Sequence, residues 1–189
     1  MTLTHIIPTL RASVPNPISR DLWPEFTTTT IADVTVAGVS LVRLAEWCGT
    51  PCVHTAAAVV PGTGGMPSAT ELASVVVARV VRVSRGMAGA LDVWIDARLD
   101  DTALVSETRM IGRVSTAADV EVRLRTIGAA GDSADRLVVP QLVRDVRAGD
   151  LLAIPCRGAA LLREVDPERR HLARDESAGE APWAGLCGR

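Results

Sequence analysis

Polar residues with catalytic potential gather in one stretch of the sequence, between positions 109 and 119. It contains two arginines, a serine and an aspartate, namely Arg109, Arg113, Ser115 and Asp119. Guanidinium groups bind carboxylates through charge-assisted hydrogen bonds, and positioned donors polarise a carbonyl group. This stretch therefore predicts a site for a carboxylate or a carbonyl compound. The alternative is that Ser115 and Asp119 shape a turn and that the arginines are solvated.

A second group lies on an alternating segment, where Asp92, Trp94, Asp96 and Arg98 share one side of an expected strand. Paired carboxylates beside an indole can act as general acids when they are enclosed, because burial raises carboxyl pKa values. If the strand is half exposed, the same side chains are simply its solvated face. The sequence leaves both interpretations open.

Cys48, Cys52 and His54 lie close together in the sequence and suggest zinc. A structural zinc site needs a fourth ligand, which would have to come from Cys156, His171 or Cys187. Free cysteine is also a good small core residue, so we expect packing here rather than metal binding. A Cys–His nucleophilic pair built from the same residues remains an alternative.

The basic residues exclude several classes of mechanism. All 20 are arginines, and the chain contains no lysine. This excludes reactions through a lysine Schiff base, including the usual covalent attachment of pyridoxal phosphate, and it excludes a P-loop. The formal net charge of −2 gives no basic footprint for nucleic acid. The apolar runs are too short to cross a bilayer and no signal peptide is visible, so we expect a cytoplasmic protein with no membrane or nucleic-acid partner.

The elements that would carry these residues are mostly strands. Val93, Ile95 and Ala97 alternate with the polar set, which is typical of a half-buried strand. A helix is expected over Val39–Trp47, ended by Gly49. We therefore predict a mainly β fold, a small barrel or sandwich with one or two short helices.

Three parts are expected along the chain. Residues 1–20 contain three prolines and little periodicity, which indicates an extended N-terminal arm. Residues 21–165 form the β-barrel domain. Residues 166–189 are charged and then rich in glycine and alanine, which indicates a flexible tail.

The stretch LWPEFTTTTIADVTVAGVSLVRLAEWCGTPCVH resembles the start of diaminopimelate decarboxylases, especially those of actinobacteria. In that family a WP segment leads through a glycine turn into a GVxLxxLAxxxGTPxV pattern. The matching positions here are Trp23, Pro24, Gly38, Val39, Leu41, Leu44, Ala45, Gly49, Thr50, Pro51 and Val53. Pro61-Gly62 is similar to the family's EPGR loop. Only about the residues Thr55–Val60 intervene where the family has its pyridoxal-phosphate-binding α/β barrel.

The resemblance resumes with the family's β domain. LDVWIDARLDD is similar to the strand before the family's DGGMSDN segment, with Asp96 and Asp101 on the matching aspartates. GRVSTAADV is similar to its GPxCxxGDV loop, where Ser115 replaces the reactive cysteine. VRAGDLLAIPCRGAA is similar to LRPGDLLAVxxxGAY, where Ala160 replaces the tyrosine that contacts the cofactor. The resemblance covers about residues 22–163 and implies the family's C-terminal β domain without its catalytic barrel.

Because the lysine, cysteine, tyrosine and phosphate loop of the family are missing, we expect no decarboxylation through pyridoxal phosphate. The first hypothesis is a small β-barrel enzyme of specialised metabolism that uses no cofactor and no metal. It would cyclise or isomerise an apolar small molecule in the barrel lumen or in a pocket at the former barrel interface. The candidate catalytic residues are Asp96, Arg109, Ser115 and Asp119. The candidate substrate-binding residues are Trp94, Arg98, Arg113 and Cys156.

The alternative hypothesis is a binding subunit without activity. Loss of a whole domain leaves an apolar surface, and soluble proteins rarely leave such surfaces bare. The chain would then pair with a decarboxylase-like protein or with another enzyme of a pathway. A homodimer is expected under either hypothesis, since two-fold pairing is the commonest way to cover such a surface.

Overall fold

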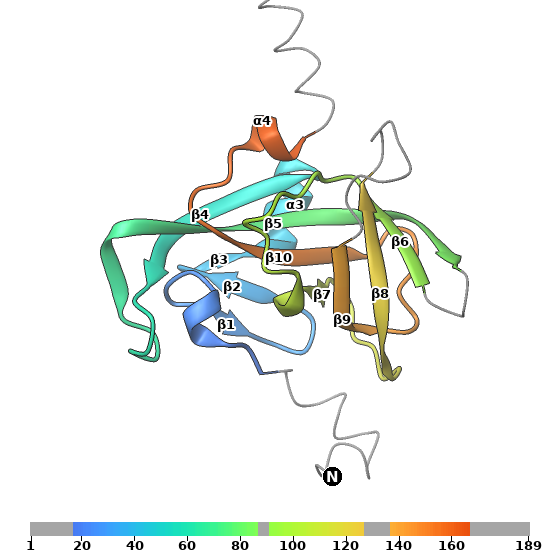
Figure 1. The fold of residues 1–189 in the computed structure, drawn as a ribbon, viewed down its shortest axis with the longest axis horizontal. Helices are drawn as coiled ribbons and strands as arrows, with labels where there is room; N and C mark the ends of the chain where they lie inside the picture. Colours follow the sequence, from blue (N-terminus) through green and yellow to red (C-terminus); the bar gives the residue numbers. More distant parts are fainter. Residues whose placement is uncertain (1–16, 87–90, 127–136, 167–189) are drawn as a thin grey trace, which may run out of the picture.

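The computed structural model describes residues 17–86, 91–126 and 137–166, and it is mainly β (Figure 1). The strands are β1 (Thr28–Thr29), β2 (Val34–Val36), β3 (Val39–Ser40), β4 (Cys52–Val59), β5 (Pro67–Arg85), β6 (Leu91–Ile95), β7 (Arg109–Ile111), β8 (Asp119–Thr126), β9 (Leu137–Val143) and β10 (Leu151–Arg157). The helices are the α-helices α3 (Leu41–Cys48) and α4 (Leu162–Val165), with the 3-10 turns η1 (Arg20–Leu22) and η3 (Val105–Glu107).

Seven strands form one sheet in the order β7-β10-β5-β6-β8-β9, with β4 added to β5. Neighbours run antiparallel except β6 and β8, which run parallel. The strands at the two ends of this order, β7 and β9, contact each other, so the sheet curls into a nearly closed barrel (Figure 1). The prediction of a mainly β fold with a small barrel and short helices is confirmed.

Strand β5 holds the sheet together, because its 19 residues pair in turn with β4, β10 and β6. Figure 1 shows it crossing the whole width of the molecule. Its side chains alternate between two cores. Val76, Ala78 and Val80 face the barrel interior, while Val75 and Val77 face the opposite side.

The barrel interior is filled with apolar side chains. The buried residues Ile95, Leu124 and Leu152 from three different strands belong to one cluster with those of β5. A barrel of this size has an interior just wide enough for side chains. The expected ligand site in the barrel lumen is therefore wrong, and any site must lie at the barrel's surface or at its ends.

The second core lies outside the barrel, between the sheet and the N-terminal elements. Trp23, Leu41 and Ala45 pack there against Val75 and Val77 of β5. Helix α3 starts at Ser40, whose side chain accepts a hydrogen bond from the amide of Arg43, and it ends at Gly49. Gly49 has a φ of 74°, which favours glycine, so the expected end of the helix is confirmed. The expected start at Val39 is wrong, because Val39–Ser40 form strand β3 and the helix begins at Leu41.

Most of the expected arm and tail, residues 1–20 and 166–189, lies outside the described residues. The described end of the arm contacts the barrel, since Ser19 donates hydrogen bonds from its amide and hydroxyl to Glu107 at 3.3 and 2.8 Å. Strand β9 continues through Pro140 to Val143. Within the described residues, no helix is both long and apolar enough to cross a membrane.

Candidate functional site

In the structure, the candidate residues lie in two hollows of the surface and in two clusters held together by hydrogen bonds or ring stacking. Arg109, Arg113, Ser115 and Asp119 line one small hollow, which we call the loop cleft. Arg98 and Cys156 line a larger one at one end of the barrel, which we call the end cavity. Asp96 and Trp94 lie in neither hollow and bind other protein groups.

The loop cleft has a volume of about 80 Å³ and lies between the segment after β1 and strands β7, β8 and β9. The sequence prediction that these four side chains belong together is consistent with this geometry. The cleft is nevertheless smaller than the roughly 300–1,000 Å³ of ordinary ligand pockets. It does not have the room that a small-molecule substrate needs.

The charges of the loop cleft are neutralised inside the protein. Arg113 donates two hydrogen bonds of 2.8 Å to Asp150, and a third of 3.0 Å to Asp145. The hydrogen bonds to Asp150, followed by those to Asp145, raise the pKa of Arg113 above its ordinary value, although burial acts in the opposite direction. Arg113 is therefore a structural ion-pair residue and has no charge free for a substrate.

Ser115 is used in the same network. Its hydroxyl donates a 2.6 Å hydrogen bond to Asp145 and accepts one of 3.1 Å from the amide of Ala117. Burial pushes the pKa of Asp145 upward, but the hydrogen bonds from Ser115 and Arg113 outweigh it and hold that pKa below its ordinary value. Asp145 thus stays ionised and fixes the loop.

Arg109 fastens the N-terminal segment to the barrel. Its guanidinium donates a hydrogen bond to the carbonyl of Pro17 and lies 3.8 Å from Glu107. Glu107 is buried and also accepts a 3.1 Å hydrogen bond from the indole of Trp23. Within the described residues, Arg109 Nε and the hydroxyl of its neighbour Thr108 are buried without a hydrogen-bond partner.

Asp96 joins three segments instead of facing a cavity. It accepts a 2.6 Å hydrogen bond from the hydroxyl of Thr50 and one of 2.7 Å from the amide of Arg79. Arg79 completes the cluster with a 3.2 Å hydrogen bond from Nε to Thr50. The carboxylate of Asp96 therefore stabilises the loop that enters β4, and the barrel strands beside it.

Trp94 lies on the outer face of the barrel in strand β6, between Arg82 of β5 and Arg125 of β8. The guanidinium of Arg82 stacks 4.0 Å from the centre of its ring, and that of Arg125 lies 5.5 Å away. Arg125 also binds Asp92, with 3.2 Å between Nε and Oδ1. Asp92 is only 6% exposed, so the interpretation of these side chains as a solvated strand face does not hold at this position.

No group of three metal-ligating side chains, from Cys48, Cys52 and His54 or from others, comes together among the described residues. His171 and Cys187, named as possible fourth ligands, lie outside the described residues. Cys52 is buried in the core beneath α3. Burial raises the pKa of the Cys52 thiol to about 11, with smaller contributions from Cys48 and Asp96. A packing role, as expected from the sequence, accounts for Cys52.

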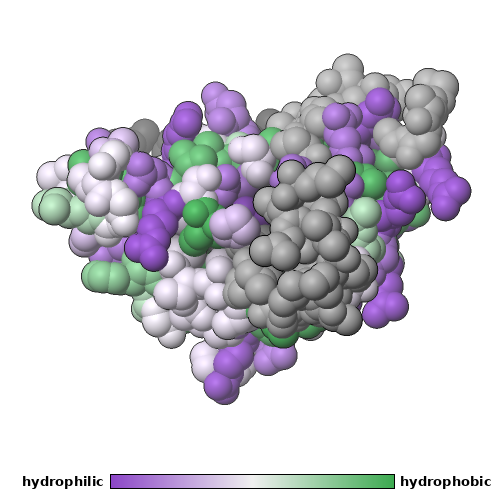
Figure 2. Space-filling model, turned by 90° about the horizontal axis from the view of Figure 1, so that it is seen from below, coloured by the Kyte–Doolittle hydropathy of each residue, from purple (hydrophilic) through white to green (hydrophobic). Residues whose placement is uncertain are grey.

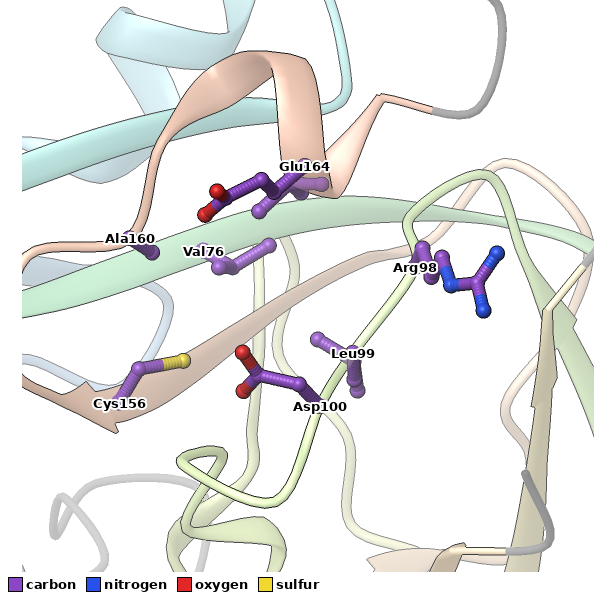
Figure 3. Close-up of a pocket in the computed structure, with 8 residues that line it drawn as sticks. Val76, Arg98, Leu99, Asp100, Cys156, Ala160 and Glu164 are labelled. Atoms are coloured by element: carbon purple, nitrogen blue, oxygen red, sulfur yellow. The ribbon is translucent and has the colours of Figure 1, made fainter. Parts of the chain in front are cut away.

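The end cavity has a volume of about 310 Å³ and lies where β5, β10, the segment after β6 and helix α4 meet (Figure 3). It is lined by Val76, Arg98, Leu99, Asp100, Cys156, Ala160, Glu164 and Val165. Its volume is about the lower limit for a small-molecule site.

Backbone hydrogen bonds hold the walls of the end cavity in place. The segment after β6 runs beside β10, where Leu104 N binds Pro155 O at 2.8 Å and Arg157 N binds Thr102 O at 3.0 Å. Arg98 N binds Val165 O at 2.7 Å and so joins this segment to helix α4. These contacts bring Asp100 and Glu164 to the same cavity although they are far apart in the sequence.

Buried Ser74 fixes the remaining wall. Its hydroxyl donates a 2.8 Å hydrogen bond to the carbonyl of Gly158 and accepts one of 2.9 Å from the amide of Ala160. Both contacts hold the turn after β10 against β5. The buried hydroxyl of Ser74 therefore holds Ala160 at the cavity wall.

Two carboxylates face the end cavity. Asp100 Oδ1 accepts a 2.9 Å hydrogen bond from the amide of Thr102 and one from its hydroxyl. Figure 3 shows the carboxylate of Asp100 and the sulfur of Cys156 pointing toward each other, and the carboxylate of Glu164 near Ala160. The guanidinium of Arg98 points away from these groups. No ion pair involves Asp100 or Glu164 among the described residues.

Cys156 supplies a neutral thiol to this wall. Its side chain is 3% exposed. Burial, and to a lesser extent the charge of Asp100, raise the pKa of Cys156 to about 12. The thiol is therefore protonated at neutral pH and is a weak nucleophile there.

Asp100 and Glu164 were not among the residues predicted from the sequence. Asp100 follows the alternating segment directly, so the end of the strand was a signal for a carboxylate at the barrel mouth. Glu164 had no such signal, because its position depends on the contact between α4 and the segment after β6. No protein-family model and no curated protein matches the chain.

Proposed function

We propose that the protein is a cofactor-independent enzyme that acts on a small, largely apolar molecule in the end cavity. The reaction class is a cyclisation or an isomerisation, in which protons move between positions of one molecule. The observation that carries this proposal is the pair of carboxylates, Asp100 and Glu164, which line the same cavity as the apolar side chains of Val76, Leu99 and Val165.

The chemistry of the two carboxylates suits proton transfer. One carboxylate accepts a proton from one position of the substrate and then, as the acid so formed, returns it at another position. Thr102 holds Asp100 through Oδ1, and the carboxylate points toward Cys156 at the cavity wall (Figure 3). Apolar walls around the bound molecule exclude water and strengthen these interactions.

The position of the end cavity also agrees with the resemblance noted in the sequence. Ala160, at its wall, stands where the decarboxylase-like pattern has a tyrosine that contacts the cofactor. The smaller side chain leaves room at a place where that family handles its ligand. We therefore propose that the pocket expected at the former barrel interface is the end cavity, in a cytoplasmic protein.

The experiment is a conversion assay with a small-molecule extract of the organism that encodes the protein. An isomerisation or cyclisation leaves the mass of a compound unchanged and alters its chromatographic retention, so liquid chromatography with mass detection identifies the converted compound. Conversion is expected without added pyridoxal phosphate, and it is expected to fall at least about 100-fold in Asp100→Asn or Glu164→Gln. Unaltered conversion in both variants contradicts the proposed roles.

A second candidate function is a binding subunit. Three large apolar side chains are strongly exposed, Trp47 at 72%, Phe26 at 68% and Met66 at 62%. On the face drawn in Figure 2, however, hydrophobic side chains are interspersed with hydrophilic ones and do not form one flat patch. Size-exclusion chromatography with light scattering, with and without a decarboxylase-like protein added, separates the candidates. A binding subunit forms a mixed complex with that partner, whereas we propose that the enzyme stays a homodimer in its presence.

A further inference from the structure

The charges around the end cavity are unbalanced, which bears on the kind of molecule it takes. Asp100 and Glu164 both line it, and neither forms an ion pair with another described residue. Arg98 is the one arginine at its wall in the part of the chain that the structure describes, and its guanidinium is directed away from the two carboxylates (Figure 3). Among the described residues, no cation is therefore paired with the negative charge of the cavity.

The rest of the wall is apolar or neutral. Val76, Leu99 and Val165 form hydrocarbon surface, and the protonated thiol of Cys156 adds no charge. A ligand that fills this space must combine a short apolar body with a group that carries positive charge. An ammonium group donates hydrogen bonds to carboxylates and neutralises them, and charge-assisted bonds of this kind are about twice as strong as neutral ones.

We propose that the ligand of the end cavity is a small primary amine that carries no carboxylate. This inference rests on the proposed function and names its substrate class. The ammonium group binds between Asp100 and Glu164, and the apolar part lies on Val76, Leu99 and Val165. A carboxylate on the same ligand would meet two negative side chains, and none of the described residues turns a cation toward it, so amino acids are expected to be rejected.

Three compounds that share one apolar body test this inference. Phenethylamine carries the amine alone, phenylalanine adds a carboxylate to it, and 2-phenylethanol replaces the amine by a neutral hydroxyl. NMR titration of the backbone amide signals of the full chain gives the dissociation constant and the location of each compound. We expect phenethylamine to bind at least about tenfold more tightly than 2-phenylethanol, and phenylalanine not to bind.

Two variants test which carboxylates bind the ammonium group of the ligand. Asp100→Asn keeps an oxygen for the two hydrogen bonds from Thr102, so the segment stays in place while the charge is lost. It is expected to weaken phenethylamine binding about tenfold and to leave 2-phenylethanol unaffected. Glu164→Gln changes an exposed side chain and is expected to act in the same direction with a smaller effect. Thermal unfolding of each variant establishes that the fold is retained.

The outcomes separate the inference from the proposed function. If all three compounds shift the signals of the end cavity equally, the cavity binds small molecules but the amine inference is overturned. If phenylalanine binds as well as phenethylamine, the exclusion of carboxylates is overturned. If no compound shifts these signals, the inference is overturned, and the conversion assay with the native extract still decides the proposed function.

Discussion

Arg113 donates two hydrogen bonds of 2.8 Å to the carboxylate of Asp150, which lies 37 residues further along the chain. Asp150 is buried and also accepts a 2.9 Å hydrogen bond from the amide of Arg147. The arginine that the sequence suggested for substrate binding thus neutralises a buried aspartate. Because the charge of Arg113 is used within the protein, we place the candidate site in the end cavity and not in the loop cleft.

Replacement of Arg113 tests this structural role. Arg113→Ala leaves the buried carboxylate of Asp150 without its cation, so the free energy of unfolding is expected to fall by about 2 kcal/mol. Urea unfolding followed by circular dichroism measures it. Arg85→Ala, at an exposed arginine of β5, is the matched control and is expected to change stability by less than about 0.5 kcal/mol. Equal stability of the two variants contradicts the ion-pair role.

Asp145 predicts a specific dependence of stability on pH. Its pKa is lowered in the folded protein by Ser115 and Arg113, so its ionised form stabilises the fold above its ordinary pKa of 3.8. This contribution is lost as the pH falls through the lowered pKa of the folded state. The wild type is therefore expected to lose more stability below about pH 4 than Asp145→Asn, in unfolding curves recorded at a series of pH values. Parallel loss in both proteins would argue against this account.

Ser74 is expected to be essential for the wall of the end cavity. Ser74→Ala leaves the carbonyl of Gly158 and the amide of Ala160 without their partner and is expected to cost about 1–3 kcal/mol. Faster hydrogen exchange of the Ala160 amide is the local readout. Ser84→Ala on the same strand serves as control, and an unaltered exchange rate in Ser74→Ala means that the wall is held by other contacts.

The cysteines are expected to differ in reactivity. Cys48 is exposed, whereas Cys52 and Cys156 are buried and have raised pKa values of about 11 and 12. Iodoacetamide at neutral pH is therefore expected to alkylate Cys48 rapidly and the other two only after unfolding, because the thiolate is the reacting form. Peptide mapping by mass spectrometry measures each site. Rapid alkylation of Cys156 in the folded protein contradicts the neutral, buried thiol described for the end cavity.

Local patterns in the sequence predicted much of the fold. The alternation of Val93, Ile95 and Ala97 correctly identified the side chains that face the core, because strand periodicity alone decides which side a residue lies on. Gly49 correctly marked the end of the helix, since a positive φ at that position favours glycine. Both features depend on neighbours in the sequence.

The candidate site could be predicted only in part, because its chemistry depends on distant contacts. Asp96 was expected to be catalytic, but its partner Thr50 is 46 residues away and the hydrogen bond between them could not be inferred from spacing. Ser115 and Arg113 were expected to meet a substrate, and they meet Asp145 instead. The residue type alone does not decide whether a polar side chain belongs to a structural hydrogen-bond network or to a reactive site.

The central claim is that the end cavity takes up a small molecule, and native mass spectrometry of the protein after incubation with the organism's small-molecule extract tests it most directly. Ala160→Trp fills the cavity from its wall, while Ala69→Trp places the same side chain at an exposed position of β5 and is the control. We predict that the wild type and Ala69→Trp retain a bound small molecule and that Ala160→Trp retains none. Retention of the same mass by all three proteins, or by none, would contradict the claim.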